Sequence, residues 1–404
     1  MSAKIPKILY AIFLLLFLGG LNFNGNAIIF MYIAAFCCIF FGGFSTKVNK
    51  LFFYILLLFC SIACSVFLNN TEGMTLLIIK YGLYPIFFIA FYNLFRWTSC
   101  IGMSENEKAY IFFLLMFFFS AGNIVHIIID MFISDMSMLG VGRRIINDVW
   151  SGGTAPTTII VGWGAFAGAV FLYTWDGWRD KIPSFLVSLF LLIVYIAFSF
   201  IAATRLGIVN ILLLILVFIV MKLRTGELVV NNSTIIKLFI GVLLLCILSY
   251  KLMPLIIESN LYTRMRGESI SLFDSNGRLD ATIYLIQHFS EALWGGNYFT
   301  SQYGLQQHNI LFQMYDTFGI LAFLLMLIIV ILSIKLTMNY FKSCSIVNSN
   351  ERRFVILLYI GLMLYCFEEP VLTSNFIITC SFFGYLGFVC QTNDSIKAIR
   401  IEGI

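Results

Sequence analysis

Charged residues are scarce in this chain: only 11% of its 404 residues are charged, whereas 61% are hydrophobic. A soluble domain carries about a quarter charged residues. Apolar runs of roughly 17–25 residues, the length of a membrane-spanning helix, recur from end to end. The composition therefore excludes an ordinary soluble domain and predicts an all-α, polytopic membrane protein, with residues 1–404 forming a single integral membrane domain.

Several sequence motifs of known chemistry are also absent. There is no Walker loop, Rossmann glycine pattern, His-Glu-x-x-His or Cys-x-x-Cys, so nucleotide hydrolysis and a zinc centre have no support. No basic patch is interleaved with aromatic residues, so we expect no nucleic-acid partner. The ten cysteines lie in apolar runs or in loops expected inside, which predicts no disulfide framework. The first outer loop, Phe23–Asn26, has no carboxylate to bind a divalent metal, so we expect neither metal nor cofactor.

Twelve membrane spans are expected from the apolar runs. The first follows Lys4 and Lys7 without a small-residue cleavage site, so we expect it to be retained. With the N-terminus inside, the inner segments hold 17 of the 25 basic residues, which predicts that both termini are cytoplasmic. The longest connection, residues 258–309, then lies outside, between spans nine and ten. The expected spans are 8–23, 27–44, 51–68, 75–95, 109–129, 157–175, 184–202, 206–222, 238–257, 310–334, 354–372 and 374–390.

Two arginines break the expected charge distribution. Arg205 lies in a very short outer connection, where arginine at membrane depth costs ~2.5–3.5 kcal/mol on insertion scales. Snorkelling to lipid headgroups is the alternative to a binding role. Arg278 follows a glycine turn and precedes Leu279–Trp294, whose apolar residues have helical spacing. This pattern predicts a helix that lies on the membrane surface or dips into it. A surface salt bridge to Asp280 or Glu291 is the alternative role for Arg278.

Two further arginines, Arg143 and Arg144, lie in a glycine-rich outer loop. A guanidinium group matches phosphate oxygens in a bidentate manner, so this pair is a candidate binding site for a diphosphate.

Polar residues recur along the start of the tenth expected span. Gln306, Asn309, Gln313 and Asp316 follow one another at spacings of three, four and three, which predicts one polar stripe on a helix facing a wet cavity. We expect Asn309, Gln313 and Asp316 to bind substrate there. His308 would border this cavity, and imidazole titrates near neutral pH, as a general base should. The alternative is that His308 is an ordinary histidine in a polar loop.

Three segments together resemble the O-antigen polymerase and ligase superfamily of bacterial surface polysaccharide synthesis. They are Ala203–Gly207 opening a span, Gly277-Arg278 with the following helix and Trp294-Gly295-Gly296, and His308-Asn309 leading into Asp316–Gly319. Each motif is weak alone, and the ordered set covers roughly residues 155–390.

The resemblance implies a metal-independent, inverting glycosyl transfer on the periplasmic face of a bacterial inner membrane. The donor would be an undecaprenyl-diphosphate-linked oligosaccharide. Arg205 and Arg278 resemble the residues that neutralise the diphosphate leaving group, and His308 resembles the residue that orients or deprotonates the acceptor. A chain-length-regulating protein is a possible partner.

Two other functions stay open at this point. Ligases commonly have a second histidine two positions before the matched one, but this chain has Gln306 there, which favours a polymerase. A flippase or other transporter would also fit twelve spans, but many carriers have two related six-span halves, and no internal repeat is visible here.

Overall fold

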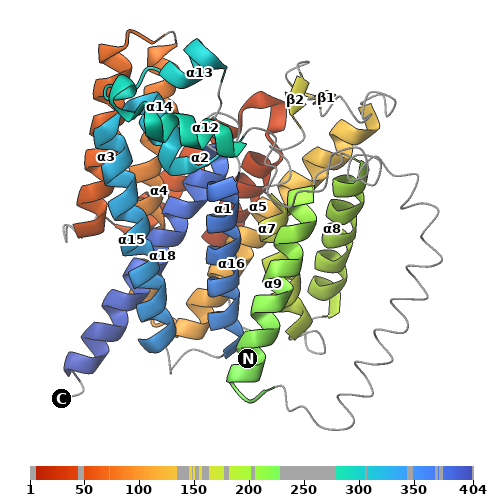
Figure 1. The fold of residues 1–404 in the computed structure, drawn as a ribbon. Coiled ribbons are helices and arrows are strands. Elements are labelled where there is room, and N and C mark those ends of the chain that lie inside the picture. The colour runs from red at the N-terminus through yellow and green to blue at the C-terminus, as the bar shows by residue number, and fades with distance from the viewer. Residues whose placement is uncertain are drawn as a thin grey trace. The chain divides into compact units, whose positions relative to one another are not determined.

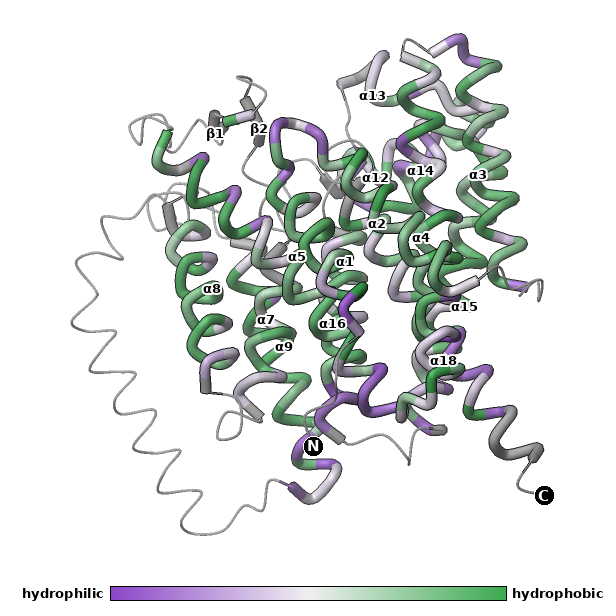
Figure 2. The backbone as a smooth tube through the Cα atoms, turned by 180° about the vertical axis from the view of Figure 1, so that it is seen from behind, coloured by the Kyte–Doolittle hydropathy of each residue, from purple (hydrophilic) through white to green (hydrophobic). Residues whose placement is uncertain are grey.

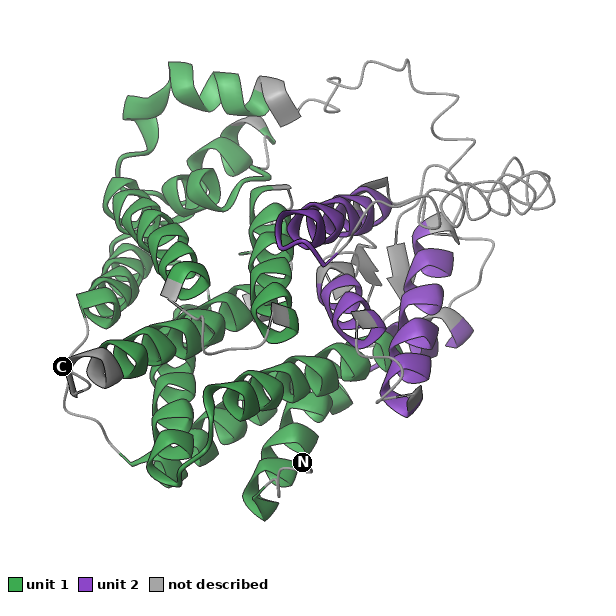
Figure 3. Ribbon diagram, turned by 90° about the horizontal axis from the view of Figure 1, so that it is seen from below, with its two compact units in different colours: residues 1–126, 275–404 green, residues 127–274 purple. Residues whose placement is uncertain are grey.

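The computed structural model describes residues 6–43, 50–71, 73–133, 145–147, 149–150, 154–156, 163–176, 182–201, 205–227, 278–304, 307–343, 349–368, 372 and 376–402. Over these residues the chain is helical, apart from one short pair of strands. The expected all-α class is thereby confirmed. The chain divides into two compact units, one of residues 1–126 with 275–404 and one of residues 127–274 (Figure 3).

The first unit contains the N-terminal and C-terminal helices. Its elements are α1 (Lys7–Gly20), η1 (Phe23–Gly25), α2 (Ala27–Gly42), α3 (Lys50–Leu68), α4 (Met74–Cys100), most of α5 (Glu105–Ile133), α12 (Arg278–Gln287), η3 (Phe289–Ala292), α13 (Tyr298–Tyr303), α14 (Ile310–Phe318), α15 (Ile320–Ser343), α16 (Ser349–Glu368) and α18 (Phe376–Glu402). The short elements α12, η3, α13 and α14 form a cap at one end of the long helices of this unit (Figure 1).

Five helices in the described part of the chain are long and apolar enough to cross a membrane: Lys50–Leu68, Met74–Cys100, Glu105–Asp130, Gly207–Arg224 and Ile320–Lys342. Shorter apolar helices accompany them at Lys7–Gly20, Ala27–Gly42, Phe166–Trp175 and Pro183–Ser199. Hydrophobic residues follow the lengths of these helices (Figure 2). Together they indicate a multi-pass membrane protein. The described residues do not confirm the expected number of twelve spans, and the span expected at 238–257 lies outside them.

The tenth expected span, 310–334, is wrong as one continuous helix. The structure divides it at Gly319 into α14 and α15, because Gly319 has φ 86° and ψ −176°, which no helix accommodates. Only α15 is long enough to span a membrane. His308 precedes α14 and does not belong to the helix, so the continuous polar stripe from residue 306 onward is also wrong.

Phenylalanine rings fill the centre of the first unit, where α4, α5, α16 and α18 meet. The rings of Phe112 and Phe388 stack with centroids 4.2 Å apart, and Phe95 meets Phe388 edge-on at 4.7 Å. Gly387 allows α18 to approach α4, since a β-carbon there would lie 2.3 Å from the Phe88 carbonyl oxygen. Close contact at small residues is how helices associate without a hydrophobic driving force in lipid.

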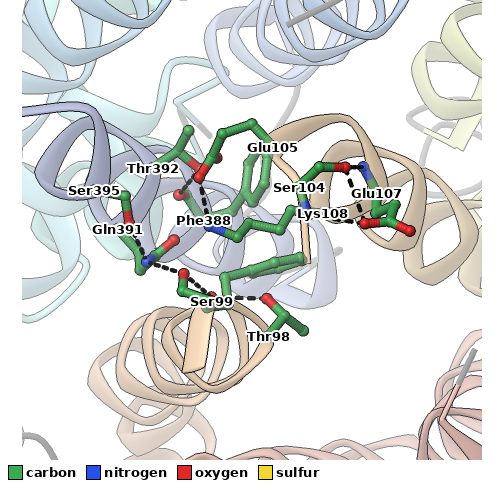
Figure 4. A network of polar contacts seen from close by, with 11 residues as sticks. Thr98, Ser99, Ser104, Glu105, Glu107, Lys108, Phe388, Gln391, Thr392 and Ser395 are labelled. Carbon is green, nitrogen blue, oxygen red and sulfur yellow. Dashed lines mark hydrogen bonds and ion pairs between the residues drawn. The ribbon is translucent and has the colours of Figure 1, made fainter. Parts of the chain in front are cut away.

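Polar groups join α4 and α18 beside the start of α5 (Figure 4). Gln391 of α18 donates to Ser99 of α4 over 3.2 Å. At the start of α5, Lys108 forms an ion pair with Glu105, and both side chains are buried. Removal of one partner of a buried pair leaves an uncompensated charge, so the folded bundle needs both residues.

The second unit contains β1 (Ile145–Asn147), β2 (Thr154–Pro156), α7 (Trp163–Asp176), α8 (Ile182–Ile201) and α9 (Arg205–Arg224). The strands pair antiparallel, with Ile146 opposite Ala155. Helix α9 approaches α8 at Gly207, where a β-carbon would lie 2.2 Å from the Tyr195 hydroxyl oxygen. A larger residue two positions after Arg205 would therefore have to displace the Tyr195 hydroxyl group.

Candidate functional site

The cap of the first unit contains two of the three segments that carry the sequence resemblance, and these two segments are in contact. The Gly296 N–H donates to the Thr317 carbonyl oxygen over 3.0 Å, and the Asn297 N–H donates to that of Asp316 over 2.8 Å. The Ile320 N–H donates to the Leu293 carbonyl oxygen over 3.0 Å. Residues 293–297 are therefore bound to the break between α14 and α15.

Glycine is needed on both sides of this contact. A β-carbon on Gly295 would lie 2.5 Å from the Thr317 carbonyl oxygen, and one on Gly319 would lie 2.5 Å from that of Leu293. Both glycines also have positive φ, 80° and 86°, which other residues rarely adopt. The glycines of the two motifs thus allow two backbone segments to meet.

Asp316 fixes the helix that follows this contact. Its carboxylate, 2% exposed, accepts from the Phe299 N–H and from the Thr300 hydroxyl, each over 2.8 Å. These donors lie in the first turn of α13, whose N–H groups have no partner within the helix. Burial raises the pKa of Asp316 above its ordinary value of 3.8, and the bonds from Thr300 and Phe299 oppose that rise. Asp316 therefore holds the cap together and does not line a wet cavity as expected.

Gln313 joins three segments of the first unit through its side-chain amide. Its Nε2 donates to the Gln307 carbonyl oxygen over 2.6 Å, and its Oε1 accepts from the Leu372 N–H over 3.0 Å. The Leu372 carbonyl oxygen in turn accepts from Lys80 over 3.2 Å and from the Tyr81 hydroxyl over 3.3 Å. Gln313 is buried and committed to these bonds, so it supports the loop before His308.

His308 stands between two residues with defined structural roles. Gln307 is buried, and its Nε2 donates to the Ala281 carbonyl oxygen of α12 over 3.3 Å. Asn309 caps α14, since its Oδ1 accepts from the Leu311 N–H over 2.8 Å. The half-buried His308 is thus held in place from both sides.

The bond from Gln307 also brings Arg278 and His308 to the same part of the cap. Arg278 is the first residue of α12, and Ala281 follows three residues later, which is about 4.5 Å along a helix axis. Two of the three expected catalytic residues thus lie on segments joined by a direct hydrogen bond.

The remaining expected site residues belong to the second unit or fall outside the residues that the structure describes. Arg205 is the first residue of α9 in the second unit. Arg143, Arg144 and Gln306 fall outside the described residues. Within the part of the chain that the structure describes, no group of three or more His, Cys, Asp or Glu residues could hold a metal ion.

Lys80 is the residue whose role the sequence suggested least. A lone lysine in an apolar span is commonly explained by snorkelling, whereas here it binds the carbonyl of a residue 292 positions later. Its position as the one charge within residues 75–95 is the only signal that sequence offered.

Comparison of the chain with protein-family models and with curated proteins finds no match.

Proposed function

We propose that this chain is a surface polysaccharide polymerase, a membrane glycosyltransferase that joins undecaprenyl-diphosphate-linked oligosaccharide units. The observation that supports it most is the contact between Trp294–Gly296 and Asp316–Gly319. These are two motifs of the sequence resemblance, and the cap that they form carries Arg278 and His308 on segments joined through Gln307 and Ala281.

In the proposed reaction, an acceptor sugar hydroxyl attacks the anomeric carbon of the donor. The new glycosidic bond forms as the bond from that carbon to the diphosphate oxygen breaks, with inversion, and the diphosphate leaves with the electron pair. His308 accepts the hydroxyl proton. Arg278 and Arg205 stabilise the negative charge that develops on the leaving group, and Arg143 and Arg144 help to bind the diphosphate.

In this proposal the polar residues after His308 do not take part in the reaction but position the groups that do. Asn309 caps α14, Gln313 binds the backbone of Gln307, and Asp316 fixes α13. Each of them therefore positions His308 or the cap and need not touch the sugar. Rigid support of this kind matters, because a misplaced catalytic group loses much of its effect.

The proposed arrangement in the cell is an inner-membrane protein with twelve spans, both termini cytoplasmic and residues 258–309 in the periplasm. A cysteine introduced at Gln302, which is exposed on α13, provides a test in a variant without native cysteines. An impermeant thiol reagent should label it in intact cells with permeabilised outer membranes. Labelling only after the inner membrane is opened would show that this loop lies in the cytoplasm and would overturn the proposed orientation.

The activity is tested with purified protein in liposomes that contain lipid-diphosphate-linked repeat units. A polymerase lengthens the glycan, a ligase needs a separate lipid A-core acceptor, and a flippase moves the units without joining them. His308→Ala should lower the rate of lengthening about 10²–10⁴-fold, the usual contribution of a general base.

His288→Ala is the matched control for His308→Ala. The His288 ring stacks on Tyr284 with centroids 4.0 Å apart, and its Nδ1 lies 2.9 Å from the Tyr284 carbonyl oxygen, so it serves the local structure of α12. Its replacement should leave most of the activity. Full-length polymer from His308→Ala at a matched protein level would reject the proposed role of His308.

A further inference from the structure

The cap has two chemically different sides. Its inner side buries Leu285, Ala292 and Phe299 against Tyr315 of α14. Its outer side exposes Ile283 and Ile286 of α12, followed by Leu293 and Trp294, with Trp294 73% exposed. An exposed run of large apolar side chains on a segment so well packed on its other side indicates a surface that has a partner.

This outer apolar surface continues onto two of the membrane-spanning helices. The Trp294 carbonyl oxygen accepts from Ser65 over 3.2 Å and from Asn69 over 3.0 Å at the end of α3, where Phe67 and Leu68 are 62% and 69% exposed. The bond from Ile320 to Leu293 similarly fixes the start of α15 beside the cap.

The two helices that meet the cap need lipid around them. Only 39% of the spanning stretch of α3, and 39% of that of α15, is buried inside the protein. Since both stretches are strongly apolar, their exposed sides face acyl chains. Leu293 and Trp294 are bonded to the ends of these same helices.

We infer that the apolar side of the cap, formed by Ile283, Ile286, Leu293 and Trp294, is immersed in the bilayer interface. Tryptophan favours this depth, because its indole ring is apolar and its N–H reaches water. The inference concerns lipid contact alone and holds whether or not the chain is a glycosyltransferase.

The charge of the segment indicates how it binds lipid. From the start of α12 to the end of α13, residues 278–303 contain three charged side chains, Arg278, Asp280 and Glu291, and only the first is basic. Interfacial helices that depend on anionic lipids are rich in basic residues. The cap is therefore held by apolar burial and by its bonds to α3 and α15, so its immersion should not depend on headgroup charge or salt.

Fluorescence of Trp294 tests the inference in the full-length protein. Wild type and Trp294→Phe are reconstituted separately into phosphatidylcholine vesicles, and the difference between their spectra is the emission of Trp294. The Phe variant should keep the fold, because α3 binds the backbone carbonyl of residue 294 and not its ring. The difference emission should be blue-shifted, largely lost in vesicles of brominated phosphatidylcholine, and little affected by aqueous iodide.

A second probe position provides the control. Gln302→Trp in the Trp294→Phe background places the indole on the exposed polar residues of α13, where iodide should quench it and brominated lipid should not. Equal quenching by brominated lipid at both positions would show that lipid contact is not confined to the apolar side of the cap.

Two further outcomes would overturn the inference itself. Quenching of Trp294 by iodide and not by bromine would place it in water. Protection from both quenchers would show that protein covers it, for example a second copy of the chain. Replacement of a third of the lipid by anionic phosphatidylglycerol, or addition of salt, should change neither result.

Discussion

Asp316 offers the most direct test of how the cap is held together. Asp316→Ala removes the acceptor of the Phe299 N–H and of the Thr300 hydroxyl. Phe299 is fully buried, so its N–H cannot turn to water while the cap stays closed. An unsatisfied buried donor costs ~1–3 kcal/mol. Thr300 is exposed and can bond to water, so it adds little to the loss.

The expected loss can be measured where it occurs, by amide hydrogen exchange in detergent micelles or nanodiscs. A decrease of ~1–3 kcal/mol in local opening free energy corresponds to a rise of about 5–150-fold in exchange at Phe299. The amides of α15 should be unchanged, because the bundle itself does not depend on this bond. Asp316→Asn keeps one oxygen for Phe299 and should show a smaller rise.

Thr300→Val separates the two hydrogen bonds of Asp316. It removes the hydroxyl donor and leaves the Phe299 N–H bonded, so exchange at Phe299 should rise less than in Asp316→Ala. Unchanged exchange at residues 299 and 300 in Asp316→Ala would refute the assignment of Asp316 as the residue that fixes α13.

Three more outcomes are expected. Lys108→Met should destabilise the protein by ~3–5 kcal/mol, because it leaves Glu105 charged and buried without its partner. Addition of Glu105→Gln should restore most of the lost stability, measured by thermal unfolding. No recovery in the double variant would contradict a paired role. Gly319→Ala should open the contact between residues 293–297 and 316–320, which would appear as faster amide hydrogen exchange at residues 296 and 297. Gly304 has φ 66° and nothing within 4 Å of its β-carbon position, so Gly304→Ala is a control for backbone strain alone. Equal effects of the two variants would argue against a close contact at Gly319. Because the pKa of Asp316 is raised in the folded cap, the cap should become less stable as the pH rises from about 3.8 through the raised pKa, and exchange corrected for its intrinsic pH dependence should show this in wild type and not in Asp316→Asn.

The class of the protein and most of its helices followed from the sequence. The helices α3, α4 and α9 begin and end within a few residues of the expected spans, apart from the C-terminal end of α4, which extends to Cys100. This is possible because the run of apolar residues that lipid requires is a local property of the chain. A helix does begin at Arg278, where the sequence predicted one, but α12 ends at Gln287 and not at Trp294, and its place at the membrane surface stays a prediction.

What each polar residue of the cap binds was decided only by tertiary structure. The spacing of Asn309, Gln313 and Asp316 predicted a shared surface, yet their side chains bond to backbone groups of three different segments. Periodicity locates a residue on a helix, but a backbone N–H from a distant segment leaves no pattern in the sequence. The same holds for Lys80 and Leu372, whose bond joins residues 292 positions apart, and for Gly319, where the need for a close approach to residue 293 arises only once the two segments have met.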